Sequence, residues 1–271
     1  MSGFSAGWLA LREPLDAAAR STALIDALLE NTGPHTHWNV IDLGAGSGSN
    51  LRYLSPRLAG VQRWTLVDHD AALLEVAAQH ADPANVTVEL RRLDLDREFS
   101  ASRGALNFPS GALVTASALL DLVSRDWIDA LAARCHAAGA TVHFALSYDG
   151  RTTCDPVDSL DASILESVNR HQRGDKGFGP ALGPDAAQYC IDAFTRAGYA
   201  MRRATSDWQI DSTHATLQAA LINGWADAAI EGAEALEVSD IDAWRARRLA
   251  LVASGRSRLI VGHEDLVGWR R

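Results

Sequence analysis

Short apolar runs alternate with amphipathic segments along most of this chain. The runs are rich in aliphatic and β-branched side chains, which is typical of buried strands, and the segments between them carry apolar residues at helical spacing. Strands that alternate with helices predict an α/β protein with an open, doubly wound, mostly parallel sheet. The expected strands are residues 40–43, 64–67, 86–90, 112–117 and 140–146.

Three glycines, Gly44, Gly46 and Gly48, follow the first of these strands at alternate positions, and a helical pattern begins directly after them. Glycine allows positive φ and a close approach of backbone to a ligand. The free N–H groups at a helix start are donors for an anionic or polar group. The turn therefore predicts a nucleotide-like ligand. A dinucleotide site would have the spacing G-x-G-x-x-G, but Ser49 stands where its last glycine would be.

The full pattern Asp42-x-Gly44-x-Gly46-x-Gly48 resembles motif I of the class I S-adenosylmethionine-dependent methyltransferases. The resemblance implies that this loop, with Asn50, wraps the amino-acid and ribose parts of S-adenosylmethionine. It covers residues 38–146 and implies a seven-stranded sheet. Residues 199–208 would be the sixth strand and residues 258–262 an antiparallel last strand.

The second expected strand ends in Asp68, twenty residues past Gly48. An acidic side chain here can accept both ribose hydroxyls, in nicotinamide and methionine cofactors alike. His69 follows it, and we expect it either beside the adenine or in a solvated loop.

The resemblance assigns four further cofactor-binding residues. Asp94 and Leu95 would bond and pack against the adenine; the alternative is a solvated acidic loop. Ser117 and Ala118, after the fourth strand, would line the floor below the transferable methyl group. Asp121 is either catalytic or, more in keeping with its position, a residue that caps or orients a turn.

The substrate side is expected after the fifth strand. Tyr148 and Asp149 fall at its carboxyl end, where ligands of parallel sheets bind. Residues 147–184 predict a long loop that acts as a lid, because glycine and proline punctuate it. Its polar side chains suit a small polar metabolite, anionic or neutral, unless the lid is only an exposed loop with solvated charges. The expected substrate-binding residues are Tyr148, Asp149, Arg170, Asp175 and Lys176.

His171 is the candidate catalytic base, because histidine titrates near neutral pH and lies in this lid. Tyr148, Asp149 and Asp175 are alternatives. Methyl transfer needs a base only where the nucleophile must lose a proton. The sequence has no cluster of acidic and histidine residues that demands a divalent metal, so we expect metal independence.

Two helical segments complete the predicted organisation. Residues 1–37 form an N-terminal helical segment that Pro14 divides, and residues 38–271 form the methyltransferase domain. The N-terminal helix either covers the sheet edge or brings Trp8 and Arg12 to the cofactor site. A helical insertion at about 212–257 contains two helices, 212–232 and 239–253, each with an N-cap serine. We expect it to be a cap over the site or a homodimer contact.

Composition limits the class of protein. The formal net charge of −9 argues against a nucleic-acid partner, and no apolar run is long enough to cross a bilayer. The three cysteines form neither a zinc pattern nor a disulfide framework, which is typical of a cytoplasmic protein. The predicted function is methyl transfer to O or N of a small molecule. The alternatives are a nicotinamide-dependent oxidoreductase, a nucleic-acid methyltransferase and a noncatalytic cofactor-binding protein.

Overall fold

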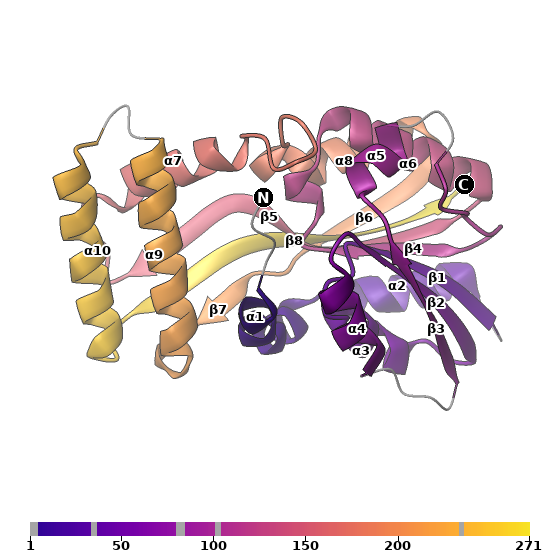
Figure 1. The fold of residues 1–271 in the computed structure, drawn as a ribbon, viewed down its shortest axis with the longest axis horizontal. Helices are drawn as coiled ribbons and strands as arrows, with labels where there is room; N and C mark the ends of the chain where they lie inside the picture. Colours follow the sequence, from indigo (N-terminus) through magenta and orange to yellow (C-terminus); the bar gives the residue numbers. More distant parts are fainter. Residues whose placement is uncertain (1–4, 34–36, 80–84, 101–103, 233–235) are drawn as a thin grey trace.

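One mixed sheet forms the centre of the computed structural model, which describes residues 5–33, 37–79, 85–100, 104–232 and 236–271 (Figure 1). Its strand order is β3-β2-β1-β4-β5-β8-β6, and β7 pairs with β8 beyond the end of β6. Strands β1 to β5 pair in parallel with one another, whereas β8 is antiparallel to β5 and β6. The predicted α/β sheet with an antiparallel last strand is confirmed, with β7 as an eighth strand.

The strands are β1 His37–Leu43, β2 Val61–Asp68, β3 Val86–Arg92, β4 Leu113–Ser117, β5 Thr141–Asp155, β6 Tyr199–Thr205, β7 Trp208–Ile210 and β8 Arg258–Arg270. The helices are α1 Ala6–Ala19, α2 Thr22–Thr32, α3 Ser49–Leu54, α4 Ala71–Gln79, α5 Leu95–Ser100, α6 Arg125–Ala138, α7 Asp161–Gln172, α8 Ala186–Arg196, α9 Ala215–Glu231 and α10 Val238–Ala253. Within the described ranges, none of these helices has the length and apolar character needed to span a membrane.

Helices cover both faces of the inner sheet formed by β1 to β5, and its central strands β1 and β4 are buried for most of their length. Helices α5, α6 and α8 cover one face around Trp127, Phe144 and Phe194. Helices α2, α3 and α4 cover the other around Leu28 and Trp64.

Strands β5 and β8 are much longer than predicted, and they leave the inner sheet together (Figure 1). Their antiparallel pairing continues as far as Asp155 and Arg258. The outer part of this pair, with β7, carries α7, α9 and α10 over a separate apolar core. We call this outer part the cap.

The prediction of a long loop at 147–184 is therefore wrong for most of its length. These residues form the outer part of β5, helix α7 and a shorter connection at 173–182. The glycines and prolines that suggested a loop are concentrated in that connection. The outer part of β5 gains its backbone partners from β8, about 110 residues later in the chain, which no local pattern could indicate.

The N-terminal helices also differ from the prediction. Pro14 lies inside α1, and the break comes at Arg20, where the backbone is extended and Ser21 caps α2 by accepting the N–H of Leu24. The Arg20 side chain makes buried contacts with the inner sheet, so tertiary contacts and not the proline decide where the helix ends.

The two helices of the C-terminal insertion are confirmed, but their serine caps are not. Asp211 caps a short 3₁₀ turn ahead of α9 by accepting the N–H of Thr213. The residue before α10 is Glu237, whose side chain makes no capping bond to a described residue.

An ion pair lies inside the cap. The Arg248 side chain is fully buried and bonds to the Asp161 carboxylate through two nitrogens. Trp244 Nε1 donates to the same carboxylate at 2.8 Å. Because Asp161 begins α7 and both partners lie on α10, this cluster joins the two helices.

Replacing Arg248 with alanine should destabilise the protein by about 3–5 kcal/mol, because it leaves a buried carboxylate without its cation. The measurement is the free energy of unfolding in urea. Arg247→Ala is the matched control, since it removes a more exposed pair with Asp158 from the same helix. Equal unfolding midpoints for the two variants would contradict the assigned role.

Candidate functional site

The three glycines after β1 form a tight turn. Gly44, Gly46 and Gly48 have φ values of 67°, 51° and 83°, which favour glycine. The N–H groups of Gly44 and Ala45 both donate to the carbonyl of Val67, which fixes the turn against β2. A Cβ on Gly48 would lie 2.8 Å from the Cβ of Ala77 in α4. Only glycine fits this last position without displacing a helix.

Asp68 closes β2 and faces the turn. Its Oδ2 accepts the N–H of Gly46 at 2.8 Å, and its Oδ1 accepts the N–H of Asp70 at 3.0 Å. The His69 side chain is largely exposed, with Nδ1 3.2 Å from Asp68 Oδ1. A carboxylate has about four lone-pair sites, so Asp68 keeps acceptor capacity for ligand hydroxyls.

Asn50 joins three segments beneath the turn. Its Nδ2 donates to Asp42 Oδ1 at 2.7 Å and to Thr115 Oγ1 at 3.0 Å, while its Oδ1 accepts from Arg20 Nη1 at 2.7 Å. Arg20 Nη2 also donates to Ser117 Oγ at 2.7 Å. These bonds connect β1, β4 and the link between α1 and α2. Asn50 therefore fixes the segment that follows the glycine turn to these three elements.

Arg20 is a site residue that sequence reasoning missed. A single arginine between two helices carries no local signal that separates it from a solvated helix end. Arg20 is nevertheless buried, and its Nε has no hydrogen-bond partner in the described part of the chain. It lines a cleft of about 260 Å³ between α1 and α3, next to Ser49.

Asp42 is the most deeply buried acid of the site. Burial raises the pKa of its carboxyl to about 7, although the Asn50 hydrogen bond and the Arg20 charge oppose the shift. Its Oδ2 has no hydrogen-bond partner among the residues described.

The predicted adenine-binding pair, Asp94 and Leu95, lies where the connection after β3 enters α5. Asp94 is half-exposed, and its Oδ1 accepts the N–H groups of Asp96 and Arg97, which caps α5. The Leu95 side chain points into the core beside Phe99, because a helix as short as α5 must bury its apolar residues against α6. Asp94 therefore lies at the surface, whereas the Leu95 side chain is buried in the core.

The ends of β4 and the inner part of β5 hold backbone strain. Ala118 and Leu146 have φ values of 52° and 57°, a conformation that costs a residue with a Cβ about 1–3 kcal/mol. The Ala118 N–H donates to Ala145 O, and the Leu146 N–H donates to Asp265 Oδ1. Such strain concentrates at functional sites. Ala118, with Ser117 before it, lies at the predicted floor.

A polar cluster lies next to this floor, around Asp121 of the 3₁₀ turn η2 (Leu120–Leu122). The Asp121 side chain is buried, and the backbone of Tyr148 and the charges of Arg12 and Lys176 lie near enough to lower the pKa of its carboxyl. Burial raises the pKa of Asp121 to about 6. We call these four residues the Asp121 cluster. Its residues come from α1, η2, β5 and the connection at 173–182.

The predicted base lies at the edge of this cluster. His171 Nε2 is 3.1 Å from Glu231 Oε2, and its Nδ1 is 3.3 Å from Lys176 Nζ. A charged lysine donates to Nδ1, so Nε2 carries the proton and donates to Glu231. Both ring nitrogens are thus engaged within the protein. Asp175 lies in an exposed turn, where its Oδ1 accepts the N–H of Gly177.

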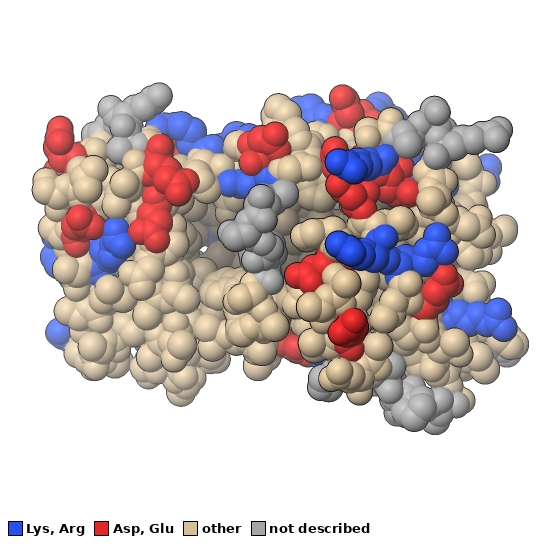
Figure 2. Space-filling model, viewed as in Figure 1, with Lys and Arg blue, Asp and Glu red and all other residues tan. Residues whose placement is uncertain are grey.

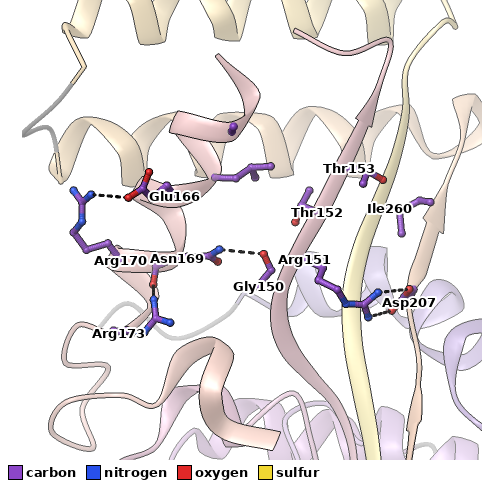
Figure 3. Close-up of a pocket in the computed structure, with 12 residues that line it drawn as sticks. Gly150, Arg151, Thr152, Thr153, Glu166, Asn169, Arg170, Arg173, Asp207 and Ile260 are labelled. Atoms are coloured by element: carbon purple, nitrogen blue, oxygen red, sulfur yellow. Dashed lines mark hydrogen bonds and ion pairs between the residues drawn. The ribbon is translucent and has the colours of Figure 1, made fainter. Parts of the chain in front are cut away.

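Of the other predicted substrate residues, Arg170 lines a separate open groove of about 810 Å³ beside α7 and the outer part of β5 (Figure 3). Arg170 pairs there with Glu166 at 3.7 Å. Asp149 bonds to Arg151, which also pairs with Asp207 across the sheet. The structure therefore brings Lys176 and His171 together, and places Arg170 in a separate groove.

Helix α1 lies over the glycine turn. The Leu9 Cδ1 is 3.3 Å from where a Cβ on Gly46 would lie. Arg12 is buried, pairs with Asp16 at 2.8 Å and stacks over Trp208. Trp8 packs against the cap core. Of the two sequence-based alternatives, this geometry favours closure of the site by α1, whereas α2 packs against the sheet.

Between α1 and α9 the surface is hollowed, as Figure 2 shows. On the same face, acidic and basic side chains are interspersed (Figure 2). Within the described ranges, no group of three or more histidine, cysteine, aspartate or glutamate residues is placed to hold a metal ion. The residues able to hold an organic cofactor are those of the glycine turn and Asp68, with the unpartnered atoms of Asp42 and Arg20 beside them.

Comparison with known proteins gives one family. Residues 40–141 match the family model of a methyltransferase domain. A hybrid PKS-NRPS synthetase, apdA of Emericella nidulans, is 29% identical over 82 residues, which are 30% of this chain but 2% of that protein. This chain therefore spans only a small part of the length of the curated relative it matches.

Among solved structures, the cyclopropane synthase MmaA2 from Mycobacterium tuberculosis is similar with a TM-score of 0.52 and 12% identity, over 98% of this chain and 95% of that one. A phosphoethanolamine N-methyltransferase 2 from Haemonchus contortus, in complex with phosphomonomethylethanolamine and S-adenosylhomocysteine, gives a TM-score of 0.47 and 13% identity. That match covers 99% of this chain and 59% of the other.

Gly48→Ala should destabilise the protein more than Gly111→Ala. Both positions have positive φ, which costs an alanine roughly 1–2 kcal/mol. A Cβ at 111 meets no described atom within 4 Å, whereas a Cβ at 48 meets Ala77. Thermal unfolding of both variants measures the difference. Equal melting temperatures would show that α4 does not press on the turn.

Asp42→Asn should change how stability depends on pH. The folded pKa of about 7 lies above the ordinary value of 3.8, so the folded state holds a proton that the unfolded state releases. Wild-type stability should therefore fall, relative to Asp42→Asn, as pH rises from about 4 to about 7. Urea unfolding midpoints of both proteins at pH 5 and pH 8 test this. A constant difference between them would contradict it.

Proposed function

We propose that this chain carries a methyltransferase domain of the class I S-adenosylmethionine-dependent superfamily and that it transfers a methyl group to O or N of a small polar metabolite. The observation that carries the proposal is the position of Asp68. Its carboxylate closes the second strand and faces a glycine turn whose last position admits only glycine.

The residues present fit S-adenosylmethionine. Asp68 would accept the ribose hydroxyls, with His69 and Asp94 on the adenine side. The turn Gly44 to Gly48 would follow the backbone of the cofactor, and the buried Arg20 guanidinium, with one unpartnered nitrogen, offers charge for its carboxylate. When bound, the cofactor supplies an electrophilic methyl group on a sulfonium. The protein supplies alignment of the acceptor above Ser117 and Ala118.

The acceptor side is the Asp121 cluster. Arg12 and Lys176 bring positive charge near the Asp121 carboxyl, and Tyr148 adds a phenol nearby. This combination supports a small acceptor with a hydroxyl or amine and an anionic group. Arg170 lines the groove beside α7, and Asp149 pairs with Arg151; neither residue is part of this proposal.

Asp68→Ala should weaken binding of S-adenosylhomocysteine at least tenfold, since a hydrogen bond to a charged group contributes about 1.5–3 kcal/mol. Isothermal titration calorimetry measures this. Asp126→Ala, an exposed acid at the start of α6, is the control. Binding of NADH instead of S-adenosylhomocysteine would favour the oxidoreductase alternative.

Methyl transfer itself is tested with S-adenosylmethionine labelled in its methyl group. The wild-type protein is incubated with a panel of small hydroxy acids, amino acids and phosphate esters, and Asp68→Ala serves as the negative control. A labelled product formed only by the wild type supports the proposal. Tight cofactor binding with no labelled product from the panel, or with labelled nucleic acid instead, counts against a small polar acceptor.

A further inference from the structure

We propose that Asp121 is the catalytic base of this site and takes the proton of the acceptor hydroxyl or amine. The assignment rests on the proposed methyl-transfer function. It replaces His171 in the role that the sequence suggested, and it identifies the acceptor as a group that carries a proton to be removed.

The backbone places Asp121 beside the transfer position. It lies three residues after Ala118, whose strained conformation turns the chain at the end of β4. The intervening Leu119 packs against the glycine turn, with Cδ1 3.3 Å from where a Cβ on Gly44 would lie. The turn that would hold the cofactor and the turn that holds Asp121 are therefore in direct contact.

One oxygen of the Asp121 carboxylate is available to accept a proton. The Asp121 side chain is buried, yet its Oδ1 has no hydrogen-bond partner in any described segment. The backbone N–H groups of Asp121 and Tyr148 lie near the carboxylate and favour its charged form. Leaving a buried carboxylate oxygen unpaired costs free energy unless a ligand completes it. A donor on the acceptor, O–H or N–H, is the complement.

The surroundings set the proton affinity of this carboxyl. The cations near it are Arg12 of α1 and Lys176 of the connection at 173–182, and Tyr148 of β5 also lies near it. Burial raises the pKa of Asp121 to about 6, and the two cations limit that rise. A general base is most effective when its pKa lies near the working pH. Partial burial of Lys176 lowers the pKa of its ammonium group.

The neighbouring groups are less suited to the role. Both ring nitrogens of His171 are engaged, with Glu231 and Lys176. His263 has a pKa lowered to about 3 by burial, and its Nδ1 lies 3.1 Å from the carbonyl of Val261. The Tyr148 hydroxyl donates to Asn169, and burial raises the pKa of this phenol.

The step balances without a further reactant. The acceptor O–H or N–H proton passes to Asp121 Oδ1, and the electron pair it leaves forms the new bond to the methyl carbon. The carbon–sulfur bond breaks with its electron pair retained by sulfur, which becomes a neutral thioether. The proton on Asp121 is then released to solvent.

A reactive analogue tests the position of Asp121 without a known acceptor. The probe is an adenosine derivative whose 5′ substituent is an aziridine, which presents an electrophilic carbon where the methyl group would lie. Asp121 Oδ1 should attack that carbon and open the ring by breaking its C–N bond. We expect peptide mass spectrometry to find the ester on Asp121, with a labelling rate that rises as pH passes through about 6.

Two variants and a competitor make the result decisive. Asp121→Asn should reduce labelling at least tenfold, Asp126→Asn should not change it, and excess S-adenosylhomocysteine should suppress it. Thermal unfolding and S-adenosylhomocysteine binding check that Asp121→Asn is folded. If that variant fails to fold, the labelled position in the wild type decides.

Wild-type protein that binds S-adenosylhomocysteine but is labelled at another residue, or not at all, overturns the role of Asp121 and leaves the proposed function intact. If the wild-type protein does not bind S-adenosylhomocysteine, both the role of Asp121 and the proposed function are contradicted. With an acceptor from the labelled panel, Asp121→Asn should also lower kcat about 100-fold or more and remove the acidic limb of the pH profile.

Discussion

The antiparallel pairing of β5 with β8 is the constraint on which the rest of the structure depends. The inner part of the pair completes the sheet that holds the glycine turn, and the outer part carries β7, α7, α9 and α10. Because a hydrogen-bonded pair of strands is continuous through both parts, it fixes the cap relative to the turn. The Asp121 cluster lies where these parts meet, with residues contributed by η2, by β5 and by the connection that follows α7.

The same strand β8 also supports the strained backbone of the site. Asp265 accepts the N–H of Leu146 at 2.8 Å and the N–H of Ser21, at the start of α2, at 2.8 Å. One buried carboxylate thus holds the left-handed residue of β5 and the break between α1 and α2. That break directs Arg20 inward to Asn50 and Ser117. Buried polar groups are costly unless they are bonded, so this set of contacts favours a single arrangement of the N-terminal helices.

Much of the cofactor half could be predicted, because its signals are local. Gly44, Gly46 and Gly48 form the expected turn, and Asp68 faces it from the end of the second strand. The acceptor half could not be predicted equally well. Arg170 and His171 are adjacent in the sequence, but Arg170 lines the groove beside α7, whereas His171 faces α9. Helix and strand periodicity decide which side each residue faces, and the prediction of a loop at 147–184 carried no such periodicity.

The sequence by itself determined the order of strands and helices and the chemistry of the glycine turn, since apolar periodicity and glycine conformation act over a few residues. Only the tertiary structure decided how far β5 extends, why α1 continues past Pro14, and which acid lies beside the floor of the site. Those outcomes depend on partners supplied by distant segments. The 15 residues of β5 need β8, Arg20 needs Asn50, and Asp121 acquires its environment from Arg12, Tyr148 and Lys176 only when four separate segments pack together.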